Sequence, residues 1–116
     1  MGEIVQFRGA KCHPDNDETV FLHPVRGDSM EPTARHGDVW IYEAVDRFTG
    51  PGVYAITDGP SYPQFRRLQP VPGSGEARVL IVSDNPLYRP QEVALADVDI
   101  LGRVSGIIAR QSVLLH

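Results

Sequence analysis

The apolar residues of this 116-residue chain occur in short runs, and turn-forming residues interrupt each of them. Ten prolines and eleven glycines are spread along the sequence. No segment of ten or more residues carries apolar side chains at the spacing of an amphipathic helix. Short runs with turn signals about every 8–12 residues are typical of an all-β domain. We therefore predict an all-β fold with strongly bent antiparallel sheets and at most one short helical turn.

The same pattern predicts where the strands lie. Residues 1–18 are polar and without periodicity around "KCHPDNDE", which predicts a flexible arm before a single domain at 19–116. Gly102 and Gly106 are expected to allow bends or bulges in the last strand. A helical turn is expected at Met30–Arg35, capped by Asp28 or Ser29. The predicted strands are 19–25, 37–45, 50–58, 62–71, 77–83 and 98–110.

Charge and composition exclude several classes of protein. The formal net charge of −4 argues against a chain that grips nucleic acid by itself. The one cysteine, Cys12, excludes an internal disulfide and fits a reducing compartment. No apolar run approaches membrane-spanning length, and the N-terminus lacks the apolar core of a signal peptide. We expect a soluble cytoplasmic protein without a metal or another cofactor.

The stretch "RGDSMEPTARHGD" (Arg26–Asp38) admits two interpretations. In the first it is a capped helical turn, because Asp and Ser are common at the N-cap of such a turn, Pro is common in its first positions and Gly commonly follows its end. In the second Ser29 is a nucleophile, with support for an oxyanion at the turn. Gly27 would then let a substrate approach, and Met30 would plug the apolar side. Asp38 is expected to cap the preceding turn through backbone amides.

Four segments in order resemble the LexA and phage-repressor family of self-cleaving proteins, which includes the UmuD-type proteins. "GDSMEPTARHGDVWIY" is similar to the nucleophile box, and "GVYAITDGPSYPQFRRLQ" to the second box with its basic residue. "VLIVSDNPLYRP" resembles the "NP-x-Y" segment, and "VDILGRVSGIIAR" the closing strand. Type I signal peptidases share the "SMxPT…GD" box but are a poorer match, since this chain shows no membrane anchor.

The resemblance implies the bent β fold of the family's C-terminal peptidase-like domain and a Ser–Lys dyad, with Ser29 as nucleophile and Gly27, Asp28 and Met30 around it. A buried lysine loses its proton and then serves as the general base. The resemblance also implies a transcriptional regulator of SOS-response type that dimerises. DNA would be bound by a separate N-terminal head, and a RecA-type protein would be the activator.

The general-base position departs from the family pattern. Arg66 stands where "QFRRL" should carry the lysine, and the next residue, Arg67, is not lysine either. Arginine keeps its proton at any relevant pH, so it cannot take one from the serine. Other bases considered are Lys11, in the polar arm, and the histidines His23 and His36.

We therefore expect a regulatory and dimerising domain in which self-cleavage is weak or lost. The alternative is an active autopeptidase with an atypical base. The family commonly cuts at Ala–Gly, whereas the arm offers only Gly9–Ala10, Ala10–Lys11 and Cys12–His13. The apolar C-terminal segment predicts a homodimer, since a partner would cover its exposed face. Period-two alternation selects as its contact side Ile107, Ala109, Gln111 and Val113.

Overall fold

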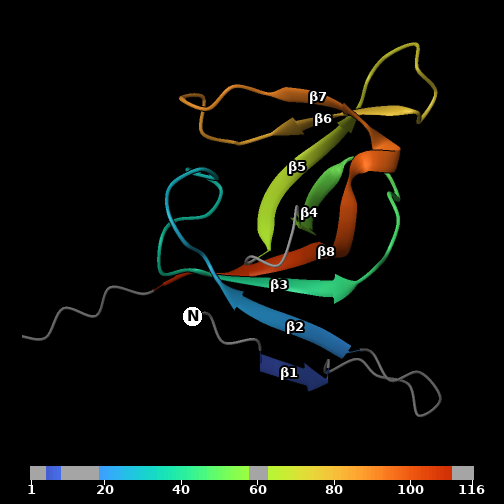
Figure 1. The fold of residues 1–116 in the computed structure, drawn as a ribbon. Helices are drawn as coiled ribbons and strands as arrows, with labels where there is room; N and C mark the ends of the chain where they lie inside the picture. Colours follow the sequence, from blue (N-terminus) through green and yellow to red (C-terminus); the bar gives the residue numbers. More distant parts are fainter. Residues whose placement is uncertain (1–4, 9–18, 58–62, 111–116) are drawn as a thin grey trace, which may run out of the picture.

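A computed structural model describes residues 5–8, 19–57 and 63–110 of the chain, and these form one bent antiparallel sheet (Figure 1). Eight strands are arranged in the order β1-β2-β3-β8-β4-β5-β6-β7, so that β1 and β7 are its edges. In the described residues no helix is long and apolar enough to span a membrane. The elements are β1 (Val5–Arg8), β2 (Thr19–Pro24), β3 (Val39–Ala44), β4 (Gly52–Thr57), β5 (Gln64–Pro70), β6 (Arg78–Val82), β7 (Gln91–Ala94), the 3-10 helix η1 (Leu95–Asp97) and β8 (Asp99–Ile108).

The all-β prediction is confirmed, and each of the six predicted strands contains an observed one. Two strands were missed. β1 lies in the segment predicted as an arm, so the boundary after residue 18 stays a prediction. β7 has the sequence QEVA, which is too short and too polar to be recognised as a strand.

The expected helical turn at Met30–Arg35 is present as a single hydrogen-bonded turn and does not extend into a helix. Residues 29–33 form consecutive turns, and the hydrogen bond from Ala34 N–H to the carbonyl of Met30 has the spacing of an α-helical bond, although the only described helix is η1. Asp28 Oδ1 accepts the hydroxyl of Tyr88, and the carbonyl of Ser29 accepts the N–H of Asn85, so both expected cap residues bond to the segment after β6.

The sheet buries apolar side chains on both faces. The first cluster gathers Trp40, Tyr42 and Phe65 under the β2–β3 loop, where Trp40 and Phe65 stack with ring centroids 5.0 Å apart. The second cluster, on the opposite face, contains Tyr54 and Leu68 with Ile56. Ala55 of β4 belongs to the first cluster, whereas its neighbours Tyr54 and Ile56 belong to the second. Because successive side chains of a strand point to opposite faces, β4 has one small core on each of its two faces.

The glycines of β8 coincide with its irregularities, as predicted. The β3–β8 register shifts between Ile41 and Tyr42, beside Gly106, and the β4–β8 register shifts beside Gly102. A Cβ at Gly102 would lie 2.6 Å from the carbonyl oxygen of Glu43, so no larger residue fits without displacing backbone. These bulges allow one long strand to pair with both β3 and β4 while bending.

The predicted outward side of β8 is wrong at Ile107. The sheet register pairs Ile107 with Trp40, and cross-strand partners share a face, so Ile107 packs against the first core cluster. Ile108 and Leu101 point outward instead and are 47% and 42% exposed. Ala109 is exposed, whereas Gln111 and Val113 lie outside the described residues.

Asp38 fixes the end of the β2–β3 loop, as the sequence predicted. Its Oδ2 accepts the backbone N–H of Arg35 at 2.8 Å, and its Oδ1 accepts that of Arg110 at 2.7 Å. The bond from Arg110, followed by that from Arg35, lowers the pKa of the Asp38 carboxyl. One buried carboxylate therefore closes the loop and ties it to the segment that follows β8.

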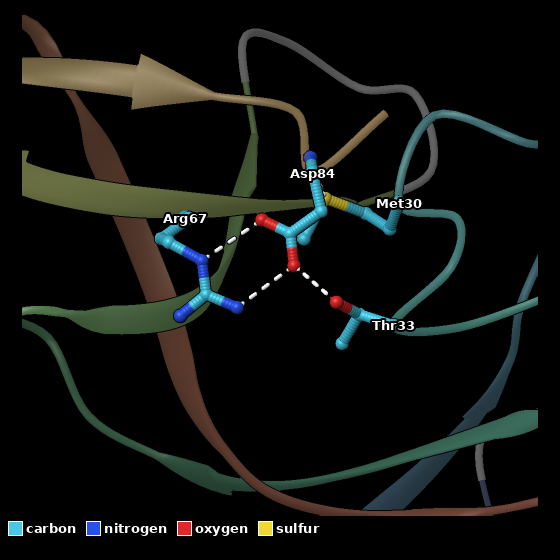
Figure 2. Close-up of polar contacts among 4 residues, drawn as sticks. All are labelled: Met30, Thr33, Arg67 and Asp84. Carbon is cyan, nitrogen blue, oxygen red and sulfur yellow. Dashed lines mark hydrogen bonds and ion pairs between the residues drawn. The ribbon is translucent and has the colours of Figure 1, made fainter. Parts of the chain in front are cut away.

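A second carboxylate holds the middle of the loop (Figure 2). Asp84, which follows β6, forms a two-pronged ion pair with Arg67 of β5, with both N–O distances 2.8 Å. The hydroxyl of Thr33 donates to the same carboxylate, and the backbone N–H of Asp84 contacts the sulfur of Met30 at 3.4 Å. The β2–β3 loop is thereby attached to β5 and to the β6–β7 loop.

Replacing Asp38 by alanine should lower the melting temperature by about 4–8 °C, since two backbone N–H groups lose their acceptor. Because the folded pKa is lowered, the carboxylate stabilises the fold fully above its unfolded pKa of 3.8, and this contribution disappears as pH falls through the folded pKa. Thermal unfolding at several pH values measures both effects. Asp46→Ala, at an exposed carboxylate, is the matched control, and equal melting temperatures for the two variants would contradict the role.

A double-mutant cycle on Arg67→Ala and Asp84→Ala should give a coupling energy of about 1–2 kcal/mol, because the pair is bidentate and its carboxylate is 12% exposed. Denaturant unfolding of the four proteins measures it. The same cycle on the Arg47–Asp46 pair, whose side chains are 79% and 87% exposed, should show no measurable coupling. Similar values for the two pairs would mean that Asp84 does not anchor the loop.

Candidate active site

Ser29 lies in the anchored β2–β3 loop between an exposed aspartate and a buried methionine. Its carbonyl accepts the backbone N–H of Asn85 at 3.1 Å, which fixes the backbone at the serine. Gly27 has φ +75°, a left-handed conformation that favours glycine, and Met30 is 3% exposed in the first core cluster. The nucleophile candidate is therefore held on a rigid turn with its neighbour in the core.

The "NP-x-Y" segment clamps this turn. The buried side chain of Asn85 donates from Nδ2 to the carbonyl of Asp28 at 2.9 Å, while its Oδ1 accepts the N–H of Leu87. The hydroxyl of Tyr88 donates to Asp28 Oδ1 at 2.6 Å. This bond to the carboxylate raises the pKa of the Tyr88 phenol. Asp28, predicted as support for an oxyanion, thus makes structural contacts at both its carbonyl and its side chain.

Ser29 and Arg66 line one cleft of about 280 Å³, although they are far apart in the sequence. Its apolar wall includes Met30, Trp40 and Phe65. The remaining lining residues are His23, Pro24, Val25, Arg26, Pro63 and Gln64. The two residues that the sequence predicted as a pair are thus brought to one cleft, while their catalytic roles stay predictions.

Arg66 differs from its neighbour Arg67 in its surroundings. One guanidinium nitrogen of Arg66 donates to the carbonyl of Phe65 at 2.8 Å. Burial lowers the pKa of Arg66, and the nearby phenol of Tyr88 acts in the opposite direction. A guanidinium remains protonated through such a change, so Arg66 can donate hydrogen bonds and hold anions but cannot accept a proton.

The two histidines considered as bases have different positions. His23 is 3% exposed and lines the cleft, and burial lowers the pKa of its imidazole below 6.5. Its Nδ1 lies 3.0 Å from the carbonyl of Pro24, which can only accept, so Nδ1 carries the proton and Nε2 is the basic nitrogen of the neutral ring. His36 is exposed, and its Nδ1 accepts the N–H of Gly27 at 3.2 Å, which gives it a structural contact in the turn. Lys11 and the candidate cleavage bonds lie outside the described residues.

A second, larger cleft of about 660 Å³ adjoins the first, and both are lined by Gln64 and Arg66. Its walls come from β4 to β7 and from the segment before β8, with Arg78 and Glu92 paired at 2.7 Å on its rim. Within the described residues no group of three or more side chains is arranged to hold a metal ion. Arg66 therefore lies where the mainly apolar cleft of Ser29 meets a more polar one.

Sequence reasoning missed the residues that position the serine turn. It quoted "SDNPLY" as part of a resemblance but assigned no role to Asp84, Asn85 or Tyr88. The sequence marks this segment only as a turn, since Asp, Asn and Pro are the usual residues where a strand ends. Their partners, 51 to 60 residues earlier in the chain, could not be identified without the fold.

Comparison with known proteins agrees with this geometry. The model of the Peptidase S24-like family matches residues 3–105, which include the serine turn, Arg66 and the "NP-x-Y" segment. The chain is 30% identical over 97 residues to the 26 kDa repressor protein of Escherichia phage HK022. That match covers 83% of this chain but only 39% of the repressor. The resemblance inferred from the four sequence segments is confirmed, and the chain belongs to the Peptidase S24-like family.

Proposed function

We propose that this chain is the C-terminal regulatory and dimerisation domain of a LexA-like or phage-repressor-like transcriptional regulator, and that its self-cleavage is weak or lost. The observation that carries the second part is Arg66, a half-buried guanidinium in the cleft that contains Ser29. A general base must release its proton near the working pH, and a guanidinium does not. The serine turn is then retained as structure without the partner that activates it.

The proposal divides the work of the regulator between two parts. An acidic body with a formal charge of −4 suits dimerisation better than phosphate contacts, which a separate N-terminal head would make. Two heads on one dimeric body would bind a two-fold-symmetric operator with a gain in avidity. Such a regulator would act in the cytoplasm, and a RecA-type activator is the partner that the family resemblance suggests.

An active autopeptidase with an atypical base is the alternative, and one observation favours it. His23 lines the same cleft as Ser29, and Nε2 is the basic nitrogen of its neutral ring. Burial keeps its pKa low, so the imidazole is unprotonated at neutral pH, as a general base must be. This alternative predicts cleavage that depends on both residues.

The purified chain should stay intact for hours at about pH 10, where a lysine base whose pKa is lowered by burial would be largely deprotonated. Mass spectrometry of the intact protein measures this, with Ser29→Ala as the control. Arg66→Lys should introduce slow cleavage that accelerates with rising pH, because a buried amine can lose its proton. A specific fragment from the unmodified chain that is absent in Ser29→Ala would contradict the proposal. Its further loss in His23→Gln would then identify His23 as the base.

The chain should sediment as a dimer at tens of micromolar, since the outward apolar side chains of β8 are otherwise exposed to water. Ile108→Glu should shift it to monomer, because a charge cannot be buried at an apolar interface without a partner. Ile107→Glu is not a suitable test, since that side chain packs into the core. Ser29→Ala should remain dimeric, and a monomer of the unmodified chain throughout this concentration range would refute the interface.

A further inference from the structure

The cleft at Ser29 has the chemistry of a receptor for a carboxylate. We propose that it binds the free C-terminal carboxylate of a peptide whose last side chain is apolar, with Arg66 pairing with the carboxylate. This inference rests on the proposed function, in which Arg66 does not act as a base. It assigns a ligand class to a site that retains the geometry of a peptidase cleft.

The first support is the unmatched charge of Arg66. The ion pairs between described residues are Arg47–Asp46, Arg67–Asp84 and Arg78–Glu92, and Arg66 is in none of them. Among the described residues its hydrogen bond goes to a neutral carbonyl, that of Phe65, although Arg66 is half-buried. A desolvated guanidinium with a single neutral acceptor gains more from a carboxylate than an exposed one does, because the pair is less screened.

The second support is the shape and polarity of the cleft. Its volume of about 280 Å³ is near the lower end of small-molecule sites, ~300–1,000 Å³. Such a space suits the end of a peptide better than a long segment. Met30, Trp40 and Phe65 offer an apolar wall, while Ser29, Arg26 and Arg66 line the same space with polar groups. An apolar side chain and a carboxylate can therefore be accommodated together.

The third support is the relation between a nucleophile and a hydrolysed product. In a serine peptidase the acyl carbon of the substrate lies against the serine hydroxyl, and after hydrolysis the same carbon belongs to a carboxylate. A lysine base at this place exchanges a proton, whereas an arginine offers a planar pair of N–H groups that fits a carboxylate. Replacing the base by Arg66 thus turns a site for cleaving peptides into one that holds a peptide end.

The test uses the full chain with Ser29→Ala, which cannot cleave through this serine, so binding is measured separately from any proteolysis. The ligands are N-acetyl-alanyl-valine, its C-terminal amide, and inorganic phosphate. Trp40, the only tryptophan of the chain, lines the cleft and reports binding by its fluorescence. We expect the free acid to bind at least tenfold more tightly than the amide and than phosphate.

The variants locate the recognition. Arg66→Gln can still donate to the carbonyl of Phe65 but has no charge, so it should lose the preference for the acid, and Arg66→Lys should retain part of it. Arg47→Gln, at an exposed arginine that lines neither cleft, should behave as the parent. Melting temperatures equal to the parent's identify folded variants.

Three outcomes would overturn the inference. The first is equal affinity for the acid and the amide, or no binding of either at millimolar concentration. The second is a preference for the acid that persists in folded Arg66→Gln. The third is phosphate binding as tight as that of the acid, which would indicate a general anion site. None of these outcomes bears on whether the chain with its serine intact cleaves itself, so the proposed function is judged by its own experiment.

Discussion

The attachment of the β2–β3 loop to the Asp84–Tyr88 segment is the interaction on which the site depends. A loop of this length would sample many conformations alone, because ordering each backbone residue costs about 1–2 kcal/mol. Here Asp84 binds both Thr33 and Arg67, and Asn85 donates to the backbone carbonyls of Asp28 and Ser29. Asn85 is buried and Asp84 and Arg67 are half-buried, so breaking a bond between such groups leaves a partly desolvated partner unsatisfied.

Two neighbouring arginines have opposite roles because the strand turns them to different surroundings. Arg67 meets a carboxylate and is used to build the loop anchor (Figure 2), whereas Arg66 meets a carbonyl and the cleft of Ser29. The pKa of Arg67 is raised by Asp84, and that of Arg66 is lowered by burial. Arginine is thus part of the loop anchor at position 67, whereas at position 66 its guanidinium faces the cleft without a carboxylate partner among the described residues.

Several features could be predicted from the sequence because they depend on local chemistry. The strands were found from short apolar runs between turn residues, and Asp38 was assigned a capping role from its place after a Gly-containing turn. Features that depend on pairing between distant strands could not be predicted in this way. Ile107 was predicted to face outward, but a bulge and its pairing with Trp40 turn it to the core. β7, an edge strand, is held by its backbone pairing with β6, and its two apolar residues are too few to predict a strand.

The sequence by itself determined the fold class, the family resemblance and the absence of a lysine at the base position. Each of these follows from the types of residue and their order along the chain, without knowledge of which residues are in contact. Only the tertiary structure decided which other residues share the cleft, that Arg67 pairs with Asp84, and that Asp84, Asn85 and Tyr88 hold the serine turn. Those facts depend on the register of β4 against β5 and on contacts across more than fifty residues, which no local pattern encodes.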